Sequence, residues 1–139
     1  MGIAIRNIPR TIVRDLQREG HSISICSITI FELAAKGAKF VQSGKIGEAR
    51  VREGLRAILG DGSIVQVDFR EPEILTHATA LRADVNDFID CLIVASGAGT
   101  CDALVSEDEE LQEIVSRDEV RHKLSPINPG FKVSKARRT

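Results

Sequence analysis

The sequence predicts an α/β fold with a mainly parallel sheet. Short segments with alternating apolar residues, the period of a β-strand, lie between longer segments whose apolar residues recur at helical spacing. Proline and glycine residues stand where several of these helices would begin and end. Strands that alternate with helices are typical of parallel sheets, because each helix returns the chain to the same end of the sheet.

The first half of the chain predicts three helices and two strands. Pro9 suits the first turn of a helix, and Gly20 suits its end. The run "HSISICS" alternates like a strand, and the pattern then becomes helical with Glu32 in the first turn. In order, we expect a helix at 9–20, a strand at 21–27, helices at 29–41 and 47–60, and a strand at 62–69.

The second half predicts three more helices and a buried strand. Pro72 opens one helix, and Asn86 or Asp87 suits the cap of a more apolar one. The expected elements are helices at 71–83 and 86–99, a strand at 101–106 and a helix at 107–117. The rest has two prolines and no sustained period, which predicts an edge element and a frayed tail. We therefore expect an α/β domain over 1–122, followed by an edge element and basic tail over 123–139.

Composition narrows the class of protein. A chain of 139 residues with 42% hydrophobic residues can build one domain with a real core. The net charge is −1 and Trp and Tyr are absent, so neither bulk charge nor aromatic stacking indicates nucleic-acid binding. Cys26, Cys91 and Cys101 have no metal-site spacing and suit buried thiols in a reducing compartment. Without a long apolar span or a signal-peptide pattern, we expect a cytoplasmic protein with no membrane contact.

Three carboxylates interrupt apolar surroundings or follow strands. Glu32 comes after the strand at 21–27, Asp90 interrupts "FIDCLIVA", and Asp108 follows the strand "CDALVS". Because ligands bind at the carboxyl ends of parallel strands, these acids can share one cleft. Three carboxylates in one cleft repel each other, and Mg²⁺ or Mn²⁺ would relieve that repulsion. Hydrolysis of a phosphodiester bond is the chemistry that uses such a site.

Each acid also has a purely structural explanation. Glu32 and Asp108 can serve the dipole of a helix N-terminus, and Asp87 suits a cap better than a ligand. Asp90 is harder to explain in this way, because an aspartate between two apolar runs needs a partner. A phosphatase or receiver-like domain would need an aspartate ending the first strand, for which only Asp68 is a candidate.

The contexts of these acids resemble the PIN-domain ribonuclease family. "SICSITIFELAAKG" is similar to that family's strand running into a helix that carries a glutamate, here Glu32. "DFIDCLIVASGAGTCDALVSEDEEL" is similar to its later block, which places Asp90 and Asp108 on the two later acids. Ser106 stands at the family's supporting hydroxyl, where it would orient Asp108. The likeness extends over residues 10–116.

The resemblance implies a three-layer α/β/α sandwich and a metal-dependent endoribonuclease. Glu32, Asp90 and Asp108 would hold Mg²⁺ or Mn²⁺, and RNA would be cut to leave a 5′-phosphate and a 3′-hydroxyl. Many members of the family are toxins of toxin–antitoxin pairs and form homodimers, and others process RNA. The implied partners are therefore an RNA substrate, an antitoxin-like protein and a second copy of the chain.

The chain departs from the family pattern at its front. The family opens with a central strand that ends in an aspartate, and the usual spacing to Glu32 would put that aspartate before Met1. "MGIAIRN" instead ends in Arg6 and Asn7. The chain could be shortened at its N-terminus, for example by a late start codon, or it could be a natural variant without the aspartate. The second explanation makes it a degenerate, non-catalytic PIN-like binding or interaction module.

The basic tail gives no clear indication of RNA binding. Its charged residues could contact phosphates, although a solvated end explains them better. These residues are Lys132, Lys135, Arg137 and Arg138.

Overall fold

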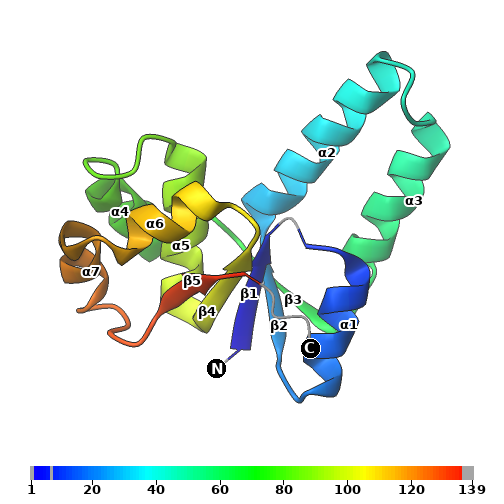
Figure 1. Ribbon diagram of the computed structural model, residues 1–139. Coiled ribbons are helices and arrows are strands. Elements are labelled where there is room, and N and C mark those ends of the chain that lie inside the picture. The colour runs from blue at the N-terminus through cyan, green and yellow to red at the C-terminus, as the bar shows by residue number, and fades with distance from the viewer. Residues whose placement is uncertain (1, 7, 136–139) are drawn as a thin grey trace.

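A five-stranded parallel sheet with helices on both faces forms the framework of the protein (Figure 1). The structure is a computed structural model that describes residues 2–6 and 8–135. The predicted α/β fold with a parallel sheet is confirmed. The elements are β1 (Gly2–Arg6), α1 (Arg10–Arg18), β2 (Ile23–Cys26), α2 (Ser27–Gln42), α3 (Glu48–Leu59), β3 (Ile64–Val67), α4 (Pro72–Leu81), α5 (Phe88–Thr100), β4 (Cys101–Ser106), α6 (Glu109–Ser116), α7 (Asp118–Leu124) and β5 (Lys132–Ser134).

The order of the strands creates a switch point in the middle of the sheet. The strands lie in the order β3-β2-β1-β4-β5, so the chain moves from β1 to one edge and later returns to the other side of β1. Ligands of open α/β sheets bind at such a point, outside the carboxyl ends of the two strands. Here those strands are β1 and β4, and their last residues, Arg6 and Ser106, are paired in register.

Strand β1 corrects one expectation from the sequence. The sequence left open that a shortened chain lacks the central strand of the family, but Gly2–Arg6 lies at the centre of the sheet and pairs with both β2 and β4. The reason is the short crossover, because α1 alone connects β1 to β2. The distance along the chain from β1 to Glu32 is therefore shorter than the usual spacing in the family. The strand ends in Arg6 instead of an aspartate, and Asn7 lies outside the described residues.

Alternation along β1 directs its side chains into two different cores. Ile5 packs with α1 and β2 on one face of the sheet, in a cluster that includes Val13 and Ile25. Ala4 belongs to the larger core on the opposite face, which α4, α5, α6 and α7 cover. Arg6 is two residues after Ala4 and shares its side of the strand. The period of the strand therefore directs this arginine toward the face that carries α5.

Helices α2 and α3 form a hairpin that extends away from the sheet (Figure 1). Only the first part of α2 has a fully buried residue, Thr29, and α3 has none. The two helices approach closely at Gly37, where an added Cβ would lie 2.6 Å from Cγ1 of Val51. The hairpin is thus held mainly by its own contacts and by its base.

Several local predictions can be compared with the observed elements. Helix α2 begins at Ser27, two residues earlier than expected, so Glu32 lies in its second turn and not in its first. The expected edge element is β5, which pairs with β4. The division at 122/123 remains a prediction, although α7 crosses it without interruption. Of the basic tail, Arg137 and Arg138 lie outside the described residues.

The cysteines are buried and unpaired, as the sequence predicted. Within residues 2–6 and 8–135, no helix combines the length and the apolar character that crossing a bilayer requires.

Candidate functional site

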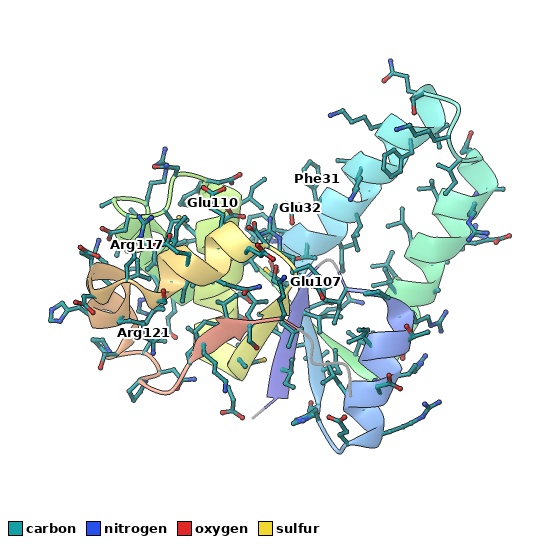
Figure 2. All side chains as sticks on the ribbon, viewed as in Figure 1. Phe31, Glu32, Glu107, Glu110, Arg117 and Arg121 are labelled. Carbon is teal, nitrogen blue, oxygen red and sulfur yellow. The ribbon has the colours of Figure 1, made fainter. Side chains whose placement is uncertain are left out.

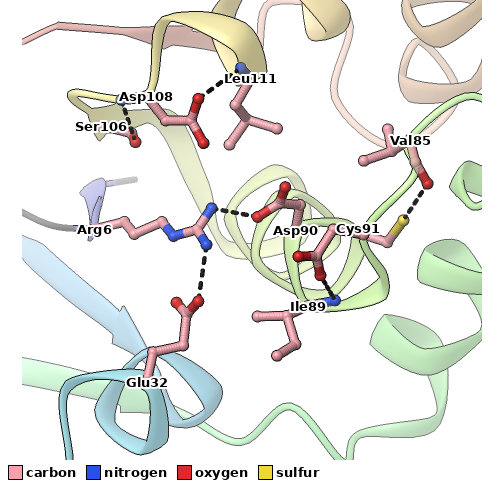
Figure 3. Close-up of polar contacts among 10 residues, drawn as sticks. Arg6, Glu32, Val85, Ile89, Asp90, Cys91, Ser106, Asp108 and Leu111 are labelled. Carbon is pink, nitrogen blue, oxygen red and sulfur yellow. Dashed lines mark hydrogen bonds and ion pairs between the residues drawn. The ribbon is translucent and has the colours of Figure 1, made fainter. Parts of the chain in front are cut away.

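Four polar side chains meet at the carboxyl ends of β1 and β4 (Figure 3). Arg6 ends β1, Glu32 comes from α2, Asp90 from the first turn of α5, and Asp108 from the turn after β4. The three predicted acids therefore gather around one place, although they lie far apart in sequence. Arg6 is the residue that the sequence analysis did not anticipate.

Arg6 forms ion pairs with two of the three acids. Its Nη1 donates a hydrogen bond to Oδ1 of Asp90 at 2.6 Å, and its Nη2 donates to Oε2 of Glu32 at 2.9 Å. Its side chain is only 7% exposed, against 26% for Glu32 and 20% for Asp90. A buried guanidinium needs such partners, because an unpaired charge at this depth would be costly.

The charge of Arg6 is maintained by these acids. Burial acts to lower the pKa of its guanidinium, but the hydrogen bonds that it donates to Glu32 and Asp90, and the charges of these acids, outweigh that effect and raise the pKa. Arginine therefore remains a cation in the site across the whole range in which the protein is folded. The site carries a permanent positive charge supplied by its own chain.

At Asp90, in contrast to Arg6, the effect of burial on the pKa outweighs the effect of the ion pair. Burial raises the pKa of its carboxyl, and the hydrogen bond from Arg6 offsets this only in part. The charges of Asp87 and Asp108 raise the pKa further. Asp108 is therefore close enough to repel Asp90, as expected for acids that share a cleft. The charge of Arg6, which lowers the pKa of Asp90, acts against this repulsion.

Asp108 caps helix α6. Its Oδ1 accepts a hydrogen bond from the backbone N–H of Leu111, and its own N–H donates to Oγ of Ser106 at 3.2 Å. Ser106 is fully buried, and its carbonyl accepts a hydrogen bond from the side chain of Gln112. Ser106 thus fixes the backbone of Asp108, while the capping role accounts for one carboxylate oxygen.

Asp87 is a helix cap, as predicted. Its Oδ1 accepts a hydrogen bond from the N–H of Ile89 at the start of α5. This contact leaves Asp90, three residues later, as the acid that α5 directs toward Arg6 (Figure 3).

A divalent cation does not fit between Glu32 and Asp90 as these side chains stand. The guanidinium of Arg6 lies between them and already satisfies one oxygen of each. Among the described residues, no group of three acidic, histidine or cysteine side chains is arranged to hold a metal ion. One buried oxygen of the site, Oε1 of Glu32, has no hydrogen-bond partner in the described part of the chain. Metal binding by Glu32, Asp90 and Asp108 therefore stays a prediction.

The comparison with family models decides the family. A model of the PIN domain matches residues 4–116, which include the whole site. The chain belongs to the PIN domain family. No curated protein matches it. The match begins inside β1, so this strand belongs to the PIN domain of the chain. Membership supports a nuclease-type function in general, with RNA as the partner and divalent metal ions as the usual cofactors of the family.

Arg6 could have been found from the sequence by the argument that singled out Asp90. In "GIAIR" an ionised side chain ends a short apolar strand and is therefore expected to be buried or to face a ligand. Its partners could not be identified from the sequence, because Glu32 is 26 residues away and Asp90 is 84 residues away.

Proposed function

We propose that this chain is a non-catalytic PIN domain that binds RNA without hydrolysing it. The observation that supports this proposal is the double ion pair of Arg6 with Glu32 and Asp90. The arginine supplies the positive charge that a metal ion would otherwise supply. Unlike a metal ion, it carries no water that could be activated for attack on a phosphodiester bond.

The surface offered to RNA is the basic hairpin, which we define as residues 36–56 at the outer part of α2 and α3. The segment contains six basic residues and two acidic ones, whereas the whole chain has a net charge of −1. All six basic residues are exposed, namely Lys36, Lys39, Lys45, Arg50, Arg52 and Arg56. Figure 2 shows the side chains of this hairpin standing clear of the sheet. Such a local excess of charge favours contact with phosphates.

Two of these charges are held together at the end of the hairpin. The Nζ atoms of Lys36 and Lys45 lie 5.8 and 5.5 Å from the centre of the Phe40 ring. Both ammonium groups are within reach of the negative face of the ring. A pair of cations fixed in this way is suited to neighbouring phosphates of a single strand.

The first experiment measures binding of a single-stranded RNA at several salt concentrations. Each lost phosphate contact should reduce the slope of log K against log salt by about 0.7. The variant Lys36→Gln/Lys39→Gln should therefore bind more weakly and show a shallower slope. Arg18→Gln, on the exposed side of α1, serves as the matched control and should leave the slope unchanged. Equal slopes for all three proteins would refute the hairpin as the RNA surface.

The second experiment tests the absence of catalysis. The wild-type protein is incubated with RNA and Mn²⁺, and its unfolding temperature is measured with and without Mn²⁺. We expect no Mn²⁺-dependent cleavage and no rise in unfolding temperature. Mn²⁺-dependent cleavage that Asp90→Asn abolishes would overturn the proposal, since contaminating nucleases would not respond to that substitution.

A metal-dependent endoribonuclease remains the second candidate. The convergence of three acids and the unpaired Oε1 of Glu32 favour it. In that case Glu32, Asp90 and Asp108 would hold Mg²⁺ or Mn²⁺ after Arg6 has moved away, and Ser106 would keep Asp108 in place. The cleavage experiment above separates the two candidates. An antitoxin-like partner, a homodimer and a cytoplasmic location stay predictions under either candidate.

A further inference from the structure

A cavity of about 290 Å³ lies under the base of the α2–α3 hairpin, apart from the three acids. Its wall combines the ends of β1 and β2, helix α1, and the facing sides of α2 and α3. Glu32, Asp90 and Asp108 do not line it, whereas Arg6 does. The cavity is therefore a second feature of the molecule, joined to the acidic site only through this arginine.

The wall of the cavity is mostly apolar. Aliphatic side chains from six different elements form it, and they include Ile5 of β1, Val13 of α1, Leu33 of α2 and Ile58 of α3. An apolar chamber with a small number of polar groups is the usual form of a binding site for a small organic molecule. By volume it exceeds the cavity of about 150 Å³ that suffices to bind benzene.

Two buried polar atoms in this wall have no hydrogen-bond partner among the described residues. They are the hydroxyl oxygen of Thr29 and the Nε of Arg6. Thr29 is 1% exposed and the Arg6 side chain 7%. Buried polar groups are almost always hydrogen-bonded, and both of these groups can donate a hydrogen bond. Thr29 lies one helical turn before Leu33, which also lines the cavity, so its hydroxyl is the donor suited to a ligand that carries an oxygen acceptor.

The charged residues of the wall have an excess of positive charge. Arg14 is paired with Asp61 at 3.1 Å, and the two charges cancel. Arg10 also lines the cavity, is exposed at its outer side, and interacts with Asp61 only through charge. An anionic group that enters the cavity would therefore meet an arginine near the surface and the unpaired hydroxyl of Thr29 inside.

We propose that this cavity binds a small aliphatic carboxylate. The hydrocarbon part packs against the aliphatic wall, and the carboxylate accepts a hydrogen bond from the Thr29 hydroxyl, with Arg10 adding its charge. This site is distinct from the exposed basic side chains proposed to contact RNA and from the acids, although it shares Gly54 with the hairpin and Arg6 with the acids. It gives this PIN domain a means to sense a metabolite of that chemical class.

Octanoate is the probe for this proposal, with 1-octanol as its uncharged counterpart. Titration calorimetry should show saturable binding of octanoate at one site, and 1-octanol should bind at least about tenfold more weakly, because it lacks the charge. Amide resonances of the cavity wall, on α1 and at the bases of α2 and α3, should shift during the titration. Saturable binding that does not shift these resonances would contradict the proposed location.

Two variants test the location by opposite means. A Cβ at Gly54 meets nothing within 4 Å, and Gly54 belongs to the cavity wall, so Gly54→Leu has room to fill the cavity. A Cβ at Gly99, in α5 and outside the cavity, also meets nothing within 4 Å, so Gly99→Leu is its matched control. We expect Gly54→Leu to abolish octanoate binding and Gly99→Leu to leave it unchanged.

Thr29→Val and Arg10→Gln test the recognition of the carboxylate. Each should weaken octanoate binding by about tenfold. Arg10→Gln should leave the weak binding of 1-octanol unchanged, because 1-octanol carries no charge. Arg10 is exposed, so its substitution keeps the test valid even if a variant at a buried position fails to fold. Undetectable octanoate binding by the folded wild-type protein, or equal affinity for octanoate and 1-octanol, would overturn the proposal.

Discussion

The Nη1 atom of Arg6 lies 2.6 Å from Oδ1 of Asp90, and this contact joins the end of the first strand to a helix 84 residues later in the chain. The pair brings a permanent cation into the centre of the acidic cluster as part of the fold itself. A metal ion can dissociate, whereas Arg6 leaves the cluster only if its side chain or β1 moves. The charge balance of this PIN domain is therefore determined by folding.

Removing the cation should expose the repulsion between the acids. Arg6→Gln keeps most of the side-chain volume but leaves Glu32 and Asp90 without their common partner. Breaking a buried ion pair costs about 3–5 kcal/mol, and the partial exposure of the two acids reduces this to about 2–3 kcal/mol. Urea unfolding at neutral pH and low salt measures the loss.

The same variant should gain a response to metal. Once Arg6 no longer occupies the cluster, Mn²⁺ can neutralise the acids and should raise the unfolding temperature of Arg6→Gln but not that of the wild type. Arg18→Gln breaks only an exposed pair with Asp15 and should change stability by less than about 0.5 kcal/mol. If Mn²⁺ leaves the unfolding temperature of Arg6→Gln unchanged, Arg6 does not take the place of a metal ion.

The raised pKa of Asp90 gives a pH dependence of known sign. Because the folded protein holds the proton of Asp90 more tightly than the unfolded chain does, ionisation of Asp90 disfavours folding. Its contribution to stability is complete below the unfolded pKa of about 3.9 and is lost as pH rises through the raised folded pKa. The difference in unfolding free energy between the wild type and Asp90→Asn should therefore fall with rising pH in this window.

The stability contribution of Asp61 should depend on pH in the opposite direction to that of Asp90. The hydroxyl and backbone N–H of Ser63 lower the pKa of its carboxyl. Its contribution is therefore present above the unfolded pKa and is lost as pH falls through the folded pKa. The profile for Asp61→Asn, obtained in the same way, should slope in the other direction. Two profiles of the same slope would contradict the assigned environment of one of these acids.

The parts of the fold that the sequence predicted are those whose signals are local. Helices such as α5 combine apolar residues with a cap, here Asp87, and both signals lie within a few residues. The strand β2 was recognisable from the alternation in "HSISICS", and β4 from the short apolar run in "CDALVS". The gathering of the three acids followed from a general rule for parallel sheets.

The parts that the sequence did not predict depend on distant contacts or on very short elements. Strand β1 was not predicted, because "MGIAIRN" ends in Arg6 and Asn7 and lacks the aspartate that marks the first strand of the family. The role of Arg6 depends on Glu32 and Asp90, whose positions in space follow only from the completed fold. The positive charge of the hairpin was hidden within a near-neutral total.

Ser106 should stabilise the site through the backbone of Asp108. Ser106→Ala removes the buried acceptor of the Asp108 N–H and should cost about 1 kcal/mol in unfolding free energy. Hydrogen exchange at the Asp108 amide should become faster in this variant. Ser116→Ala removes an exposed hydroxyl that donates to the Glu113 carbonyl, and it should have little effect on either measurement. Unchanged exchange at Asp108 would show that Ser106 does not hold this turn.

Gly37 should control how closely the two helices of the basic hairpin pack. In Gly37→Ala the new methyl group would lie 2.6 Å from Cγ1 of Val51, closer than real contacts allow, so α2 and α3 must separate. Overpacking of this kind costs about 1–3 kcal/mol, which exceeds the gain of about 1 kcal/mol that alanine brings to a helix. We expect a net loss of stability, measured by urea unfolding.

The double variant separates the clash from any other effect at Gly37. In a Val51→Ala background the obstructing methyl groups are absent, so Gly37→Ala should become neutral or stabilising through its helix propensity. Gly54→Ala, where a Cβ meets nothing within 4 Å, should be stabilising in either background. Gly37→Ala could instead lower the free energy of unfolding equally with and without the Val51 side chain. In that case the close contact between α2 and α3 does not determine the geometry of the hairpin, and the two helices must be held by their attachment at the base.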